Sequence, residues 1–256
     1  MSSRSMTLLA ADDPAPAVAE NSGAASPFLL VCDHAGRATP RRLGTMGLPA
    51  AGWEEHIAWD IGALELSRRL GDALDACLIH QAYSRLVIDC NRSPDHPASI
   101  VTAADGWTVP GNVDLAADEA QARRLAVFEP YHARIGAELD GRAARGLSTL
   151  LVCVHSFTPS MGGVSRPWHV GVLHLGDSPA STAMLDLLGR EADLVVGDNE
   201  PYAMDGTDYT APFHARRRGI DAVELEVRQD LLQDPDQALR MAELFIRLLP
   251  RVIAPG

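Results

Sequence analysis

Two histidines stand directly after apolar runs of the sequence. His34 follows LLVCD, and His155 follows LLVCV. A neutral imidazole is the commonest side-chain ligand of zinc and related ions. A lone histidine at the end of a strand is more often structural, but two in equivalent places with acidic residues nearby fit a metal site as well as they fit a structural role. A catalytic zinc site needs a third protein ligand and leaves one position open.

Two aspartates are candidates for that third ligand. Asp60 lies in EEHIAWDIGA, where His56 and Asp60 are four residues apart and would share one face of a helix. Asp33 is adjacent to His34. The structural alternative for Asp60 is an ordinary acidic residue in a first helical turn, where the helix dipole favours negative charge. We prefer Asp60 and keep Asp33 as the alternative.

Two glutamates within one apolar run are candidates for a general base. Glu224 and Glu226 in VELEVRQD would project from the same face of a strand. A carboxylate there is costly unless it is paired or functional. Partial burial raises its pKa, which suits a base that takes a proton from water and returns it to a departing amine. We prefer Glu226; an ion pair with Arg228 is the structural alternative.

Further polar residues could hold a substrate or its transition state. Asn91 and Arg92 follow RLVIDC, and the planar fork of an arginine binds a carboxylate through two hydrogen bonds. Arg85, at the start of that run, and His214, in YTAPFHARRRG, are candidates for stabilising the transition state. Their structural alternatives are a solvated arginine and a loop cap.

The elements that must position these residues alternate between strand and helix. Apolar runs typical of strands buried in a parallel sheet occur at 28–32, 76–80, 86–90, 150–154, 170–175, 194–196 and 222–227. Helical patterns cover about 54–75, 113–145, 180–191 and 236–249. This alternation predicts an α/β fold with a mostly parallel sheet between helices. The candidate residues follow strand ends, where such sheets bind ligands.

Composition limits the possible roles of the chain. Residues 1–26 are rich in Ala, Ser, Pro and Asp and are predicted to be a flexible leader, followed by a single domain at 27–256. The formal net charge of −12 disfavours nucleic acid and anionic membranes as partners and favours a small-molecule substrate.

The predicted compartment is the cytoplasm. No apolar stretch approaches the roughly 20 residues that span a bilayer, and the N-terminus lacks the apolar core of a signal peptide. The four cysteines lie in apolar runs without C-x-x-C spacing, which predicts small buried thiols rather than disulfides. The sequence leaves the oligomeric state open.

Six stretches, in this order, resemble the N-formylglutamate amidohydrolase family: VCDHAGRATP, EEHIAWDIGA, YSRLVIDCNRSP, VHSFTP, DGTDYTAPFHARRRGI and VELEVRQDLL. The resemblance covers nearly the whole predicted domain. It implies a phosphorylase/hydrolase-like α/β fold, a three-layer sandwich with a mostly parallel or mixed central sheet, which is shared with the zinc carboxypeptidases.

The likeness to the carboxypeptidases extends to individual residues. Asn91 and Arg92 resemble the pair that binds a terminal carboxylate, His155 resembles the later zinc-binding histidine, and Glu226 resembles the catalytic glutamate. The carboxypeptidases place a glutamate three residues after the first histidine, but here Arg37 has that place. The carboxylate ligand must therefore come from elsewhere in the chain.

The resulting hypothesis is a metal-dependent amidohydrolase. Zinc, or another divalent ion, would be held by His34, Asp60 and His155, and the substrate would be N-formylglutamate or another N-acyl amino acid. The alternatives are a carboxypeptidase-like enzyme or N-acyl amino acid deacylase, and a non-catalytic carboxylate-binding protein on the same fold.

Overall fold

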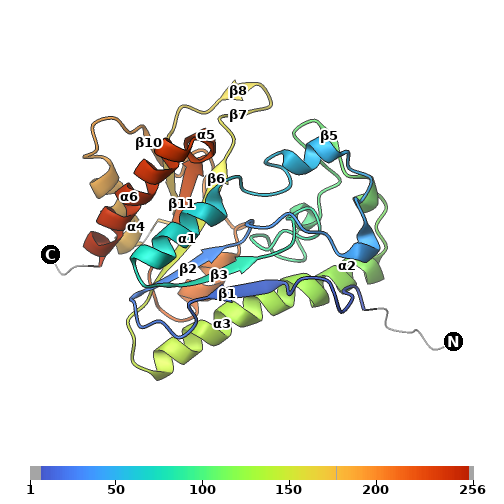
Figure 1. Ribbon diagram of the computed structural model, residues 1–256, viewed down its shortest axis with the longest axis horizontal. Coiled ribbons are helices and arrows are strands. Elements are labelled where there is room, and N and C mark those ends of the chain that lie inside the picture. The colour runs from blue at the N-terminus through green and yellow to red at the C-terminus, as the bar shows by residue number, and fades with distance from the viewer. Residues whose placement is uncertain (1–6, 177, 254–256) are drawn as a thin grey trace.

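A seven-stranded mixed sheet forms the centre of the protein (Figure 1). The computed structural model describes residues 7–176 and 178–253. The strand order across the sheet is β1-β3-β2-β6-β11-β9-β10. These strands span Ala17–Glu20 (β1), Phe28–Cys32 (β2), Cys77–Gln81 (β3), Leu150–Phe157 (β6), Val170–Leu173 (β9), Val196–Asp198 (β10) and Ala222–Arg228 (β11).

Helices cover both faces of the sheet, as the α/β prediction requires. Their bounds are Ala63–Ala73 (α1), Ala117–Arg123 (α2), Glu129–Ala144 (α3), Pro179–Leu188 (α4), Asp230–Gln233 (α5) and Pro235–Val252 (α6). In Figure 1, α1, α4 and α6 lie together on one side of the sheet, and α3 runs along the other side. The three-layer architecture with a mixed sheet is therefore confirmed.

Two small hairpins complete the strand set. They are formed by β4 (Ala103–Ala104) with β5 (Trp107–Thr108) and by β7 (Ser160–Met161) with β8 (Val164–Ser165).

The predicted helix at 113–145 is present as α2 and α3, joined by a π-helical turn at Arg124–Phe128. Among the described residues, none of the helices is long and apolar enough to cross a membrane.

The parallel strands explain why the candidate residues converge. β2 pairs in parallel with β3 and β6, and β6 pairs in parallel with β11, so their carboxyl ends meet at one edge. Every residue of β2 and β6 is buried, because alternate side chains enter the two cores on either side of the sheet. The four cysteines are buried free thiols, as predicted.

The predicted strand at 86–90 is wrong. This segment forms turns after β3, with the Val87 amide donating to Ser84 O and the Asp89 amide donating to Ser99 O. Its apolar side chains are nevertheless buried in the core on the α3 side of the sheet. An apolar run indicates burial, and here burial is reached without pairing to a neighbouring strand.

The predicted helix at 54–75 is too long at its N-terminal end. A 3₁₀ turn occupies Ala50–Glu54, and the α-helix begins only at Ala63. Gly62 has φ of 82°, a left-handed conformation that separates the helix from the turns before it. Asp60 therefore lies in a loop, where its backbone amide donates to His34 O at 2.9 Å.

The predicted leader contributes a strand to the sheet. Within it, β1 (Ala17–Glu20) pairs antiparallel with β3. The Tyr83 hydroxyl also donates to the carbonyl of Pro14, which attaches the segment before β1 to the domain. Residues 1–6 of the predicted leader lie outside the described residues.

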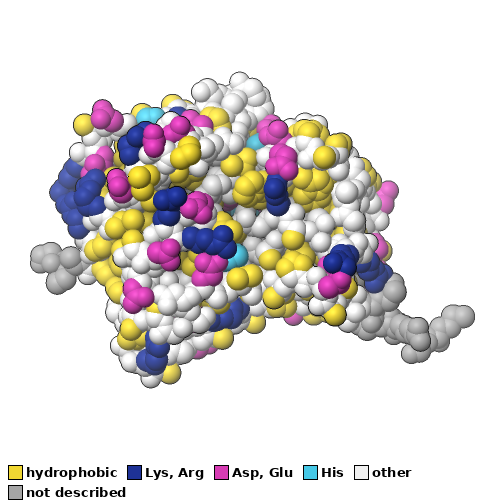
Figure 2. Space-filling model, viewed as in Figure 1, with side chains coloured by type: hydrophobic (Ala, Val, Ile, Leu, Met, Phe, Trp, Pro, Cys, Tyr) yellow, Lys and Arg dark blue, Asp and Glu magenta, His cyan; other side chains and the backbone are white. Residues whose placement is uncertain are grey.

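The surface carries many ion pairs. Arg68 contacts Glu20, for example, and Figure 2 shows basic and acidic side chains interspersed on one face.

Gly36, two residues after His34, is expected to be intolerant of a side chain. A Cβ atom at this position would lie 1.9 Å from Ala82 O, so the backbone would have to move. We expect Gly36→Ala to lower the free energy of unfolding by about 1–3 kcal/mol, as other overpacked sites do. The matched control is Gly141→Ala in α3, where nothing lies within 4 Å of the added atom.

Because alanine favours helix, that control should gain up to about 1 kcal/mol. Urea unfolding of both variants beside the parent measures the two changes. Equal stability of the two variants would contradict the packing argument.

Candidate active site at the carboxyl edge of the parallel strands

A cavity of about 240 Å³ opens where β2, β6 and β11 end. It collects most of the residues predicted from the sequence, although their segments are far apart in the chain. Those that line it are His34, Asp60, Arg85, Asn91, Arg92, His155, Glu224 and Glu226. Arg37 is half exposed and pairs with Glu54.

His34, Asp60 and His155 form the centre of the cavity wall. Asp60 Oδ2 is 2.8 Å from His155 Nδ1 and 3.4 Å from His34 Nδ1. One potential ligand atom from each residue lies within 4.8 Å of the others, and all three side chains are buried. His34 Nδ1 has no hydrogen-bond partner among the described residues. This donor set and its spacing fit a divalent metal ion such as zinc.

The outer nitrogen of each imidazole faces a second carboxylate. His34 Nε2 is 2.7 Å from Asp89 Oδ1, and His155 Nε2 is 3.3 Å from Asp33 Oδ2. Metal-binding histidines usually donate their other ring N–H to a carboxylate or carbonyl, which fixes the tautomer and the ring orientation. Asp33 thus contacts the far side of His155, and Asp60 is the aspartate on the cavity side.

Asp89 was missed in the sequence. It lies within the apolar run LVIDC, and the acid in an otherwise apolar segment was the available signal. The predicted strand would have used its backbone for pairing, whereas the observed turn directs its carboxylate to His34 and Arg85.

The charges of this cluster are strongly coupled. Burial by itself lowers the pKa of His155, but hydrogen bonds with Asp33 and Asp60 outweigh it and raise that pKa well above its usual range. Burial likewise opposes ionisation of Asp89, but Arg85 and His34 hold its pKa well below the usual range. Three buried aspartates around two imidazoles require compensating positive charge, which protons or a metal ion can supply.

Glu226 lies directly beside His155 in the sheet. The two residues are partners in the parallel register of β11 and β6, while Glu224 pairs with Cys153. Burial raises the pKa of Glu226 to about 7 and that of Glu224 to about 8. Arg228, the predicted structural partner, pairs with Asp230 instead. Both glutamates keep one carboxyl oxygen without a hydrogen-bond partner among the described residues.

The two arginines of the cavity each have an acidic partner. Arg85 Nη2 is 2.6 Å from Asp89 Oδ2, and Arg85 also approaches Asp60 at 3.5 Å. Arg92 donates through Nη1 to Asp208 and to Asn91 O. Arg92 lines the cavity and is about a quarter exposed, and a guanidinium carries further N–H donors besides those on Nη1.

The predicted transition-state role of His214 does not fit its position. His214 lies in a π-helical turn at Pro212–Arg216 and does not line the cavity. Its Nε2 is 3.0 Å from His132 Nδ1, and burial and the neighbouring His132 lower its pKa to about 3. Asp208, six residues earlier in the chain, does line the cavity. His56 also lines the cavity and contacts Asp105.

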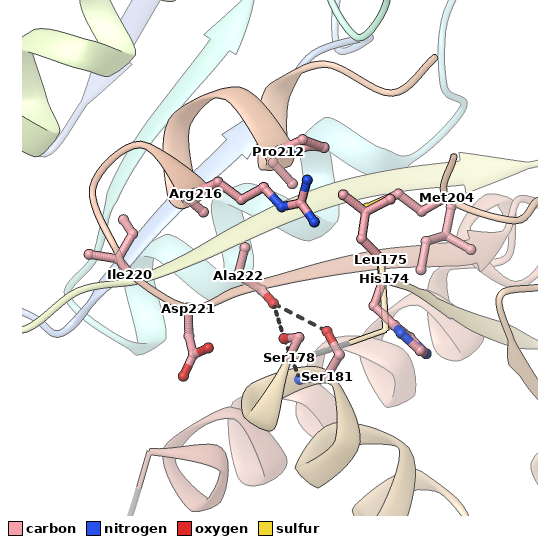
Figure 3. A pocket seen from close by; sticks show the side chains of 13 residues that line it. His174, Leu175, Ser178, Ser181, Met204, Pro212, Arg216, Ile220, Asp221 and Ala222 are labelled. Carbon is pink, nitrogen blue, oxygen red and sulfur yellow. Dashed lines mark hydrogen bonds between the residues drawn. The ribbon is translucent and has the colours of Figure 1, made fainter. Parts of the chain in front are cut away.

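A second pocket lies at the opposite end of β11, where that strand begins (Figure 3). The hydroxyls of Ser178 and Ser181 there both donate to Ala222 O, and His174 contacts Asp198. No group of histidine, cysteine and acidic residues with metal-ligand spacing occurs there among the described residues. The cavity around His34 and His155 is therefore the candidate active site.

The fold resembles those of two solved bacterial proteins. A gene product of Agrobacterium tumefaciens is 35% identical, with a TM-score of 0.92 and coverage of 96% of this chain and 98% of that one. The N-formylglutamate amidohydrolase from Ralstonia eutropha has a TM-score of 0.72 at 18% identity and covers 93% of this chain and 97% of its own. None of the curated proteins compared with the chain matches it.

The sequence pattern of N-formylglutamate amidohydrolase matches residues 26–233. The family match, together with this acid- and histidine-lined cavity, supports an enzyme of the hydrolase class. The chain therefore belongs to the N-formylglutamate amidohydrolase family, as its motifs predicted, and the family supports hydrolysis of an amide bond.

The buried carboxyl of Glu224 should make stability depend on pH. Its pKa in the folded protein is about 8 rather than the ordinary 4.5, so the folded state keeps this proton to higher pH than the unfolded chain. Its contribution to stability is complete below pH 4.5 and is lost as the pH rises toward 8. We expect Glu224→Gln, which cannot ionise, to be more stable than the parent at pH 8 by about 2–4 kcal/mol.

This advantage should largely disappear near pH 5. Urea unfolding at both pH values, with a chelator present, measures it. Glu243→Gln, at an exposed position of α6, is the control, and its free energy of unfolding should equal that of the parent at both pH values. A gain for Glu224→Gln that is equal at the two pH values would contradict the assignment.

Proposed function

We propose that the protein is a zinc-dependent amidohydrolase that cleaves the acyl–nitrogen bond of an N-formyl or other N-acyl amino acid. One observation carries the proposal: a buried His34–Asp60–His155 cluster lies in the same cavity as Glu226 and Arg92. These are the parts that amide hydrolysis needs: a cation site, a proton carrier and an anchor for a substrate anion.

His34, Asp60 and His155 are the proposed metal ligands. When bound, a zinc ion supplies Lewis acidity and makes water a nucleophile near neutral pH. Asp89 and Asp33 face the outer nitrogens of the two imidazoles, so the outer nitrogens would keep their protons while the inner nitrogens bind the ion. Family membership and this donor arrangement support the assignment.

Glu226 is the proposed proton carrier. Its pKa of about 7 lets the carboxylate accept a proton from the attacking water and later donate it to the nitrogen that leaves. Water oxygen bonds to the acyl carbon, the carbon–nitrogen bond breaks, and formate or another carboxylate is released with the free amino acid. Arg85 contacts both Asp89 and Asp60, and its proposed role is to hold these carboxylates while its charge faces the cavity.

Arg92 is the proposed anchor of the substrate α-carboxylate. Its guanidinium can form paired hydrogen bonds with a carboxylate, which fixes the amide relative to Glu226. Asn91 is the proposed support of Arg92, because its carbonyl accepts a hydrogen bond from Arg92 Nη1. Its side-chain Oδ1 in turn accepts hydrogen bonds from the amides of Tyr209 and Thr210. N-formylglutamate is the first substrate to test because the family description names it.

The proposal predicts that removal of metal abolishes hydrolysis. The purified chain would be dialysed against a chelator, and release of formate and amino acid would be measured from N-formylglutamate, N-formylaspartate and N-acetylglutamate. We expect turnover to fall to background and to return when zinc is added. The chelator-treated protein without added metal is the control. Turnover that is unaffected by removing the metal would refute zinc dependence, and no turnover of any substrate would refute the activity.

Substitution of Glu226 tests the proton carrier. Glu226→Gln keeps the shape of the side chain but cannot accept the proton, so we expect kcat to fall by about 100-fold to 10,000-fold. Substrate should still bind, which isothermal titration calorimetry on this variant can measure. Glu224→Gln is the matched control two residues away on the same strand face and should keep most of the activity. The reverse pattern would assign the role to Glu224.

A further inference from the structure

The segment Asp208–Thr210 contacts two residues that line the candidate active site, Asn91 and Arg92, and also Asp33, which does not line it. Asp208 binds Arg92, and the amides of Tyr209 and Thr210 donate to Asn91 Oδ1. The remaining contact is made by the hydroxyl of Thr210, which reaches Asp33. Asp33 does not line the cavity, so this contact can affect the site only through His155, which Asp33 faces.

The Thr210 hydroxyl has one proton to donate and two acceptors near it. Its oxygen is 2.9 Å from Asp33 Oδ1 and 3.4 Å from Cys90 O. The shorter contact is to a carboxylate, and a hydrogen bond to an ionised acceptor is the stronger one. Thr210 is 0% exposed and Asp33 is 1% exposed, so water cannot replace this bond.

The hydrogen bond from Thr210 determines what remains for the other oxygen of Asp33. Asp33 Oδ2 has no hydrogen-bond partner among the described residues, and it faces His155 Nε2 at 3.3 Å, within ion-pair distance. Asp60 Oδ2 faces the other ring nitrogen, Nδ1, at 2.8 Å, so without a metal ion both ring nitrogens of His155 can carry a proton. A cation bound on the cavity side would replace the proton on Nδ1, and Asp33 would retain the proton on Nε2.

We propose that Thr210 is a positioning residue for His155. Its hydroxyl orients Asp33, and Asp33 holds His155 in the tautomer and ring orientation that leave Nδ1 able to bind a divalent metal ion beside Asp60. The inference rests on the proposed function, because it assigns Thr210 a role in metal binding.

His34 is also held by an aspartate, but the donor to that aspartate is an arginine and not a hydroxyl. His34 Nε2 faces Asp89, and Asp89 is held by Arg85. Each metal-site histidine thus has its own aspartate, and each aspartate has its own donor. Arg85 was recognisable in the sequence by its charge, whereas a threonine hydroxyl gives no comparable signal.

The test is the zinc affinity of the full chain, measured by competition with a chromophoric chelator after the protein has been stripped of metal. Thr210→Val removes the hydroxyl and keeps the shape of the side chain. We expect its zinc dissociation constant to rise by about 10-fold to 100-fold, the usual effect of losing such an outer contact. Thr210→Ser keeps the hydroxyl and should restore an affinity close to that of the parent.

Thr158→Val is the matched control. Thr158 is also buried, but its hydroxyl donates to Ser160 O at 2.9 Å and has no part in the site. Its zinc affinity should equal that of the parent. Melting curves of the metal-free proteins check that each variant folds, and if Thr210→Val does not fold, Thr210→Ala is compared with Thr210→Ser in its place.

The outcomes separate this inference from the function on which it rests. Unchanged zinc affinity in Thr210→Val, with turnover intact in the parent, overturns the role of Thr210 and leaves the proposed function standing. An equal loss of affinity in Thr210→Val and Thr210→Ser also overturns it, because the hydroxyl would then not be the cause. Failure of the parent itself to bind zinc overturns both.

Discussion

The burial of three aspartates around two imidazoles is the constraint on which the rest of the site depends. An ion removed from water costs several kcal/mol even after the protein relaxes, so carboxylates in this position need partners at hydrogen-bonding distance. Asp33, Asp60 and Asp89 find them in His34, His155 and Arg85. The cluster is therefore stable only when positive charge is present, which is the condition that a divalent cation satisfies.

The sheet provides the rigidity that such a cluster requires. His155 and Glu226 lie within adjacent parallel strands and are partners in register, so their separation is determined by the backbone of the sheet. Asp60 and Asp89 come from turns instead. Their backbone amides donate to His34 O and to Ser99 O, respectively, which keeps the turns in place. Strands and anchored turns together hold a site of buried charges with little freedom to relax.

The position of Asp60 also explains how this chain departs from the carboxypeptidase pattern. Arg37 stands three residues after His34, where a glutamate ligand would be, but its guanidinium lies over the ring of Trp59 and pairs with Glu54. The carboxylate beside the histidines comes from a different loop. Such a donor set can be assembled from distant places in a sequence, because a metal ion responds to donor atoms and not to their spacing along the chain.

The sequence alone determined the α/β class, the family and the histidines, glutamates and arginines of the cavity, because apolar runs report burial and the ends of parallel strands meet at one edge. It failed for the strand at 86–90, for the start of α1 and for His214, since each of these depends on contacts with distant segments. Tertiary structure decided that Asp60 faces the two histidines while Asp33 lies behind His155. Asp33 and His34 follow β2 in a turn and Asp60 comes from another loop, so only the packed fold shows which of the two aspartates lines the cavity.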